Sequence, residues 1–227
     1  MTIQEYFGDW STILDLTKIT RNLEVLSKAK YQCCPSIKDI FKAFKLCSLH
    51  DLRVVILGQD PYPNIINGKP VATGIAFANS PDTSEKDYSP SLDILKDSVI
   101  DYTRPHGIIN FDQSLEKWES QGVLLINSAL SCQAGKTGSH SLMWWPFIKS
   151  LLQRLSECHT GIVYVLMGKE AQNFESYINP QFNHIIKCNH PSWYARTHTS
   201  MPSDIWEEIN TILIGQNGYG IEWFTEY

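Results

Sequence analysis

Four short runs of consecutive apolar residues stand out along the chain. They cover Arg53–Leu57, Val123–Ile126, Ile162–Met167 and His184–Cys188. Runs of this length, without alternation between apolar and polar residues, are typical of strands buried on both faces of a parallel sheet. We therefore expect four such strands at the centre of the fold.

Longer segments with apolar residues at helical spacing lie between these runs. One follows Pro35 and covers Ser36–Leu46, and a second opens at Ser91. Further candidates are Trp144–Leu155, Glu170–Tyr177 and Pro202–Ile214. Strands that alternate with helices predict an α/β fold, here a three-layer α/β/α sandwich around a short, mostly parallel four-stranded sheet.

The chain shows no internal repeat, low-complexity tract or linker-like run, and its 227 residues suit one domain that spans residues 1–227. No apolar run approaches the ~18 residues that a membrane span requires. The first residues lack the basic and apolar regions of a secretory signal. We therefore expect a cytoplasmic protein that does not enter a membrane.

Composition adds two constraints. None of the 6 cysteines forms a Cys-x-x-Cys pair, so the sequence predicts no zinc or iron–sulfur site and no cofactor. The formal net charge of −5 argues against a protein that coats nucleic acid indiscriminately. A local contact surface for nucleic acid remains compatible with this charge.

Polar residues follow the predicted strands at the points where the strands end. Asp60 and Tyr62 follow the first strand, Asn127 the second and His190 the fourth. Ligands of open α/β sheets bind beyond the carboxyl ends of the strands, so these four side chains are expected to converge. Together a carboxylate, an aromatic ring, an amide and an imidazole can polarise, read and hydrolyse a small polar ring.

Several motifs resemble segments of a known family. They are Gly58–Tyr62 (GQDPY), Gly74–Phe77 (GIAF), Leu124–Asn127 (LLIN), Ser139-His140 followed by Trp145 and Phe147, and His190–Ser192 (HPS). In this order they are similar to motifs of family 1 uracil-DNA glycosylases, and the similarity runs from about Trp10 to Trp223. The resemblance implies an enzyme that flips uracil out of DNA and hydrolyses its N-glycosidic bond, which releases uracil and leaves an abasic site.

The resemblance assigns catalysis to Asp60 and His190. Asp60 would orient the attacking water and stabilise positive charge on the sugar, whereas neutral His190 would donate a hydrogen bond to uracil O2. Taken alone, Asp60 could instead form a turn before Pro61, and His190 could be a satisfied polar group after a strand.

The resemblance assigns substrate binding to four residues. Asn127 would read N3–H and O4 of uracil, Tyr62 would stand against C5, and Phe77 would stack on the flipped base. Gln59, in the same loop as Asp60, belongs to this group. The structural alternatives are a helix N-cap for Asn127 and core packing for the two aromatic rings.

DNA contacts are implied at five further positions. Ser91 and Ser192 match segments that bind DNA phosphate in the family, although Ser91 could instead cap a helix. Lys169 departs from the family pattern and is either a substitute phosphate contact or a solvated lysine. Trp193 and Tyr194 stand where the family has proline and its wedge leucine, so Tyr194 is the expected wedge; either ring could instead pack onto the protein.

Two other departures come directly after the catalytic loop: Pro63 replaces a family histidine, and Asn64–Lys69 lengthens the following stretch.

The expected partners are uracil-containing DNA, single- or double-stranded, and a DNA-mimicking inhibitor protein. The chain is expected to act as a monomer in a bacterial cell or a virus-infected host cell. Three alternatives are a catalytically idle DNA-binding scaffold or processivity module, a glycosylase for another base, and a small-molecule hydrolase.

Overall fold

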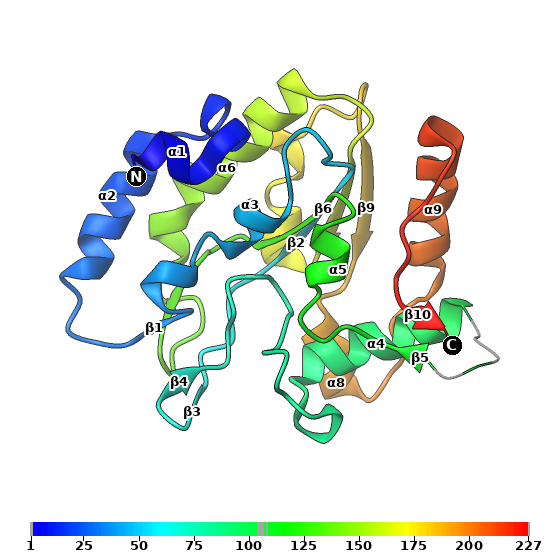
Figure 1. Ribbon diagram of the computed structural model, residues 1–227, viewed down its shortest axis with the longest axis horizontal. Helices are drawn as coiled ribbons and strands as arrows, with labels where there is room; N and C mark the ends of the chain where they lie inside the picture. Colours follow the sequence, from blue (N-terminus) through cyan, green and yellow to red (C-terminus); the bar gives the residue numbers. More distant parts are fainter. Residues whose placement is uncertain (1, 104–106, 108, 227) are drawn as a thin grey trace.

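A four-stranded parallel sheet forms the centre of the computed structural model, which describes residues 2–103, 107 and 109–226. The strands are β2 (Val54–Gly58), β6 (Val123–Asn127), β8 (Val163–Met167) and β9 (His184–Cys188). Their order across the sheet is β6-β2-β8-β9, and every neighbouring pair is parallel. Helices flank the sheet (Figure 1), which confirms the predicted α/β/α class.

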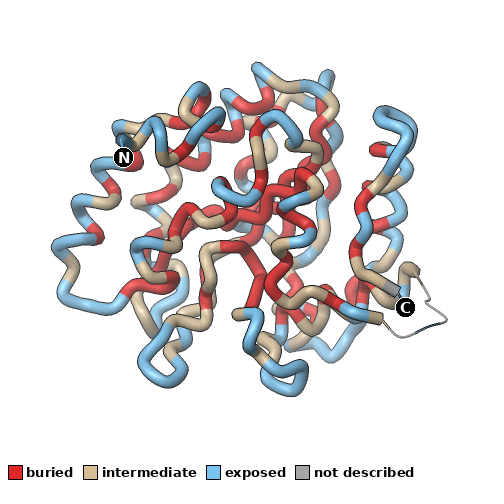
Figure 2. Tube along the Cα trace, viewed as in Figure 1, coloured by how far each residue is buried: buried red, intermediate tan, exposed pale blue. Residues whose placement is uncertain are grey.

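The helices form two groups around the sheet. The α-helices are α1 (Ile3–Phe7), α2 (Leu16–Ser27), α3 (Lys42–Leu46), α4 (Pro90–Thr103), α5 (Glu116–Glu119), α6 (Ser141–Cys158), α7 (Lys169–Gln172), α8 (Pro191–Thr197) and α9 (Asp204–Asn217). In Figure 1, α1, α2 and α6 lie on the left, whereas α4, α8 and α9 lie on the right. Helix α2 packs on α6, and α4 packs on both α8 and α9. The buried residues concentrate along the sheet between these groups (Figure 2). Within the described chain, no helix is long and apolar enough to cross a bilayer.

Short 3-10 helices and two-stranded sheets complete the chain. The 3-10 helices are η1 (Gly8–Thr12), η2 (Ile37–Asp39), η3 (Glu85–Asp87) and η4 (Glu175–Tyr177). The paired short strands are β1 (Cys33–Cys34) with β7 (Cys132–Gln133), β3 (Ile65–Ile66) with β4 (Lys69–Pro70), and β5 (Ile109–Asn110) with β10 (Thr225–Glu226). All three pairs are antiparallel.

The structure corrects the expectation that all four strands are buried on both faces. In β2, β6 and β8 every residue is buried, but β9 lies at the edge of the sheet and only Ile186 is buried in it. His184 and Lys187 in β9 are exposed. Strand β6 is also an edge strand and yet is fully buried, so an apolar run of this length does not indicate whether both faces of its strand are covered.

Two predicted helices are interrupted. The segment 36–46 forms η2 and then α3, with a turn at Ile40 and Phe41 between them, and both side chains are buried there. The segment 170–177 divides into α7 and η4, and fully buried Phe174 lies at the junction. Burial of these three side chains in the core takes precedence over continuous helical hydrogen bonding.

Helix α6 is longer than the predicted segment Trp144–Leu155. It begins at Ser141, passes through Pro146 and ends at Cys158. Pro146 lies in the second turn, where its missing N–H removes one helical hydrogen bond. Buried Trp144 and Phe147 on either side of it pack against the core and hold the helix together.

Candidate active site at the carboxyl edge of the sheet

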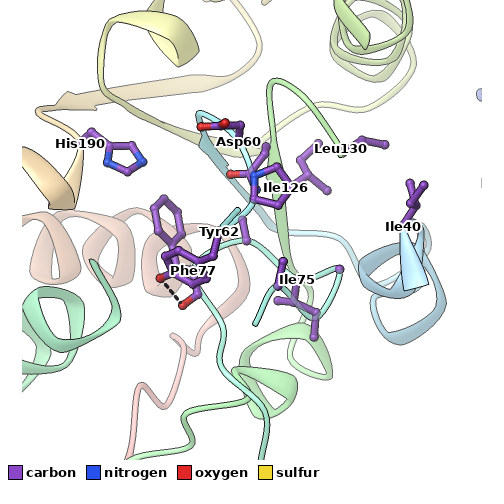
Figure 3. Close-up of a pocket in the computed structure, with 13 residues that line it drawn as sticks. Ile40, Asp60, Tyr62, Ile75, Phe77, Ile126, Leu130 and His190 are labelled. Carbon is purple, nitrogen blue, oxygen red and sulfur yellow. Dashed lines mark hydrogen bonds between the residues drawn. The ribbon is translucent and has the colours of Figure 1, made fainter. Parts of the chain in front are cut away.

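A pocket lies at the carboxyl edge of the sheet and brings together residues that are far apart in sequence (Figure 3). Its lining comprises Ile40, Asp60, Pro61, Tyr62, Ala72, Gly74, Ile75, Ala76, Phe77, Ile126, Asn127, Leu130 and His190. Five of the eleven site residues expected from the sequence are among these: Asp60, Tyr62, Phe77, Asn127 and His190. Parallel strands bring these residues together, because their carboxyl ends share one edge of the sheet.

Asp60 lies just beyond the end of β2 and is anchored by the loop before α6. The backbone N–H of Gly138 donates a hydrogen bond of 2.6 Å to Oδ2 of Asp60. Burial raises the pKa of Asp60 above its usual value, the Gly138 hydrogen bond opposes this, and the charge of Glu170 adds to the rise. Oδ1 accepts no hydrogen bond from a described residue, so it is available to a molecule in the pocket.

His190 caps the N-terminus of α8 with its own ring. The backbone N–H of Ser192 donates to Nδ1 of His190 at 3.2 Å, so Nδ1 is an acceptor. A neutral ring with an unprotonated Nδ1 carries its hydrogen on Nε2. Burial, assisted by the charge of Arg196, lowers the pKa of His190 to about 4. At neutral pH the ring is therefore an uncharged donor through Nε2–H.

Asn127 ends β6 beside Gly58, its register partner at the end of β2. A Cβ atom on Gly58 would lie 2.4 Å from Oδ1 of Asn127 and 2.8 Å from Cζ of Phe77, so only glycine fits there. Asn127 is buried, and its side-chain amide makes no hydrogen bond to the described part of the chain. It caps no helix, because bends follow β6 and α6 begins only at Ser141. The amide is thus free to bind a ligand.

The two aromatic residues of the pocket are linked to each other. The Tyr62 hydroxyl donates to the carbonyl oxygen of Phe77 at 2.9 Å (dashed in Figure 3). Phe77 has a φ of 67°, a left-handed conformation that is uncommon for a bulky residue. Its ring centroid lies 5.4 Å from that of His190. Such local strain often accompanies functional sites, and here it places a flat ring against the pocket.

Six expected site residues do not line the pocket, and three of them, Gln59, Ser91 and Lys169, lie outside the segment that follows His190. The carbonyl of Gln59 accepts from Ala129 N–H at 3.0 Å and from the Ser128 hydroxyl at 2.7 Å, which joins the loops that follow β2 and β6. Ser91 is only 4% exposed and lies inside the first turn of α4, so the N-cap interpretation is wrong. Lys169 is exposed at the start of α7.

The segment after His190 is a helix, α8, rather than an open loop. Its geometry separates the two neighbouring aromatic residues: Trp193 is 40% exposed, whereas Tyr194 is 6% exposed and belongs to the core. Helix α8 packs on α4, and Tyr194 is on its buried side. The sequence placed the wedge at Tyr194, but the ring presented to solvent is that of Trp193. Ser192 beside it accepts from Arg196 at 3.2 Å.

Sequence reasoning missed two features of the pocket. Gly138, the donor to Asp60, is far from Asp60 in sequence and carries no local signal for that contact. The apolar wall formed by Ile40, Ile75 and Leu130 was likewise not predicted. Among the described residues, no group of three histidine, cysteine or acidic side chains is arranged to hold a metal ion.

Comparison with known proteins identifies the family. A model of the uracil DNA glycosylase superfamily matches residues 44–214. The chain belongs to this superfamily. Uracil-DNA glycosylases of Yersinia pestis (strain Pestoides F) and Yersinia pseudotuberculosis (serotype O:3, strain YPIII) are each 36% identical over 195 residues, which cover 83% of this chain and 80% of each relative. These matches confirm the expected function, a DNA repair glycosylase.

Solved structures share the architecture. Mimivirus uracil-DNA glycosylase superposes with a TM-score of 0.76 at 23% identity, over 98% of this chain and 93% of that one. The Nitratifractor salsuginis UNG gives 0.61 at 21% identity, over 81% and 83%. At this identity both show the fold alone. A mimivirus UNG variant in complex with UGI gives 0.78 at 25% identity, over 91% of this chain and 80% of that one.

Proposed function

We propose that this glycosylase is of the family 1 type and hydrolyses deoxyuridine in DNA, with Asp60 and His190 as the catalytic pair. The observation that carries this proposal is the convergence of two groups on one pocket: Oδ1 of Asp60, which has no hydrogen-bond partner among the described residues, and Nε2–H of a neutral His190. Asn127 and Phe77 line the space between them. The active unit is the single domain of residues 1–227.

Asp60 and His190 act at opposite ends of the C1′–N1 bond, Asp60 at the sugar and His190 at the base. Oδ1 of Asp60 orients a water molecule toward C1′ of the sugar and stabilises the positive charge that develops there. As the C1′–N1 bond breaks, its electron pair remains on uracil, and Nε2–H of His190 donates to O2 where negative charge gathers. The water oxygen bonds to C1′ while one of its protons passes to Oδ1 of Asp60; this proton reaches the uracil anion through solvent, so the products are neutral uracil and an abasic site.

The remaining pocket residues select the base. The Asn127 amide matches N3–H and O4 of uracil, whereas cytosine presents the reverse pattern. Tyr62 stands against C5 and leaves no room for the methyl group of thymine. A site that hydrogen-bonds its substrate rejects a mismatched analogue by about 10⁴-fold or more, because buried polar groups are left unpaired. Gln59 contributes indirectly, through the backbone contacts that hold this loop.

The DNA contacts follow from the base-flipping requirement, since a base within the stack cannot reach the pocket. Trp193, the exposed ring on α8, fills the space that the flipped nucleotide leaves. Ser192 and Lys169 contact phosphates near the pocket. Ser91, which is buried in α4, can contribute only after a local rearrangement of that helix terminus.

The partners and location follow from this activity. The substrate is uracil-containing DNA, single- or double-stranded, and a DNA-mimicking inhibitor protein that covers the same face is a further partner. UGI in the mimivirus complex supports such an inhibitor. The protein acts as a monomer in the cytoplasm of a bacterial cell or of a virus-infected host, without a metal or an organic cofactor.

The proposal is tested by uracil release from oligonucleotides that contain uracil, thymine or cytosine at one position, in EDTA. Release from the uracil substrate alone is expected. Asp60→Asn and His190→Ala are each expected to lower the single-turnover rate at least about tenfold, since each removes one stabilising interaction, with DNA binding retained. Binding without release by the unaltered protein would favour the idle scaffold, and release from free deoxyuridine alone would favour a small-molecule hydrolase.

A further inference from the structure

A hairpin formed by residues 64–70 rises directly from the rim of the pocket. Tyr62 precedes it and Ala72 follows it, and both line the pocket. Strands β3 and β4 are joined by Asn67 and Gly68, both with positive φ, the pattern of a tight hairpin turn. The tip of the hairpin is exposed, and Ile66 is 60% exposed (Figure 2).

Two neighbouring segments hold the hairpin in place. Gln32 Nε2 donates to the carbonyl of Gly68 at 3.1 Å, and the N–H of Gly135 donates to the carbonyl of Pro63 at 2.9 Å. The segments around Gln32 and Gly135 are themselves paired through β1 and β7. In Figure 1, β1 and the β3–β4 hairpin lie together, away from α8. Three separate stretches therefore form one continuous surface beside the pocket.

This surface has a charge opposite to that of the whole protein. Residues 28–36, 61–72 and 128–143 contain four lysines and no aspartate or glutamate, in a chain whose net charge is −5. The four, called here the lysine rim, are Lys28, Lys30, Lys69 and Lys136. All four are exposed, and none forms a salt bridge with a described residue. Exposed lysines that form no salt bridge with a described residue are suited to a polyanion.

We propose that the lysine rim binds the DNA backbone several nucleotides from the flipped uracil, on the side of the pocket opposite α8. The hairpin extends the contact surface outward from the pocket, so a strand whose uracil occupies the pocket passes over it. The rim and Trp193 then hold the DNA on two sides of the flipped nucleotide. This inference rests on the proposed function, because it is the bound uracil that positions the strand.

The test compares two triple variants of the full chain. In the rim variant, Lys30, Lys69 and Lys136 are each changed to alanine. The matched control changes Lys45, Lys117 and Lys149, exposed lysines on α3, α5 and α6 outside the rim, to alanine and so alters the net charge equally. Binding is measured across a salt series with single-stranded DNA of about 20 nucleotides, longer than the site of about 4–16 nucleotides in single-strand binders.

The rim variant is expected to bind this DNA several-fold more weakly at low salt. The slope of log affinity against log salt should fall by about 2, near 0.7 for each lost phosphate contact on a single strand. KM for a long uracil substrate should rise while kcat stays unchanged, and a substrate of about 4 nucleotides, too short to reach the rim, should be processed normally. Lysine-to-arginine changes at the same three positions should restore binding.

Two results would overturn the proposal. In one, the rim variant binds long DNA like the matched control. In the other, it loses as much activity on the short substrate as on the long one, which would place the effect in the pocket. If the unaltered protein released no uracil from either substrate, the proposed function itself would fail, and the salt series would still decide whether the rim contacts DNA.

Discussion

At the scale of single residues, the site depends on which atoms already have partners. Backbone N–H groups occupy Oδ2 of Asp60 and Nδ1 of His190, which leaves Oδ1 and Nε2–H for the substrate. Each side chain is thereby fixed in orientation, and the His190 ring, whose pKa is lowered to about 4, is neutral at pH 7 before the substrate arrives. Burial has opposite effects on the two groups: it raises the pKa of the acid and lowers that of the imidazole.

The charge of Arg196 contributes to the neutrality of His190. Arg196→Gln should raise the pKa of His190 above about 4, yet leave it below the ordinary value of 6.5, because burial is the larger cause. Titration of the His190 ring by NMR measures this directly. Since the ring must be neutral to donate from Nε2 alone, the acid limb of kcat should move to higher pH in the variant. An unchanged titration would show that Arg196 does not act on the ring.

Base choice is a second test at this scale. Asn127→Asp should lose activity on uracil and gain some on cytosine, because a protonated carboxyl can present the reversed hydrogen-bond pattern. Tyr62→Ala should admit thymine weakly by opening space at C5. Release of each base from matched oligonucleotides measures both effects, and Phe174→Leu, altered in the core away from the pocket, is the control. An unaltered base preference in both variants would contradict the pocket as proposed.

At the scale of elements, α8 determines which aromatic residue can meet DNA. A helix places consecutive residues on different faces, so Trp193 points to solvent while Tyr194 packs beside α4. An extended loop with the same sequence could present both rings. The two interrupted helices also show burial at the level of the element: the helical pattern breaks at Ile40 and Phe41 and at Phe174, and all three side chains are buried in the core.

The two aromatic residues of α8 should therefore respond differently to truncation. Trp193→Ala should slow excision from duplex DNA several-fold more than from single strands, because a wedge matters most where a complementary strand competes for the base. It should leave the melting temperature nearly unchanged. Tyr194→Ala should lower the melting temperature, since truncating a large buried ring costs about 3–5 kcal/mol. Excision rates on the two substrates and thermal melts test this, and the reverse pattern would restore Tyr194 as the wedge.

At the scale of the whole molecule, one buried acid affects stability. Glu119 is 1% exposed; its Oε1 accepts from Leu125 N–H in β6 at 2.9 Å, and its Oε2 has no described partner. Burial raises the pKa of Glu119 well above 4.5. The folded chain therefore holds a proton that the unfolded chain releases above that pH. This contribution to stability is complete below pH 4.5 and declines as pH rises toward the folded pKa.

Glu119→Gln should remove this pH dependence while keeping the acceptor for Leu125 N–H. The difference in melting temperature, variant minus wild type, should increase from pH 5 to pH 8. His190 acts in the opposite direction, because its lowered pKa costs stability as pH falls from 6.5 to about 4. Thermal melts over this range test the prediction, with exposed Glu157→Gln as the control. A constant difference would mean that Glu119 is not protonated in the folded protein.

The sequence by itself determined the parallel sheet and the positions of Asp60, Tyr62, Asn127 and His190, because buried strands leave a local apolar signature and ligands gather at their carboxyl ends. The order of the motifs along the chain was enough to indicate the family. These properties depend on residues close together in sequence, or on a topology with few alternatives.

Only the tertiary structure decided that β9 lies at the edge, that Gly138 anchors Asp60, and that Trp193 rather than Tyr194 faces solvent. The lysine rim likewise emerges only when three distant segments pair. Each of these features depends on which neighbour a residue meets across the fold. Local patterns of apolar and polar residues reveal that a side chain is suited to burial, but not which contact buries it.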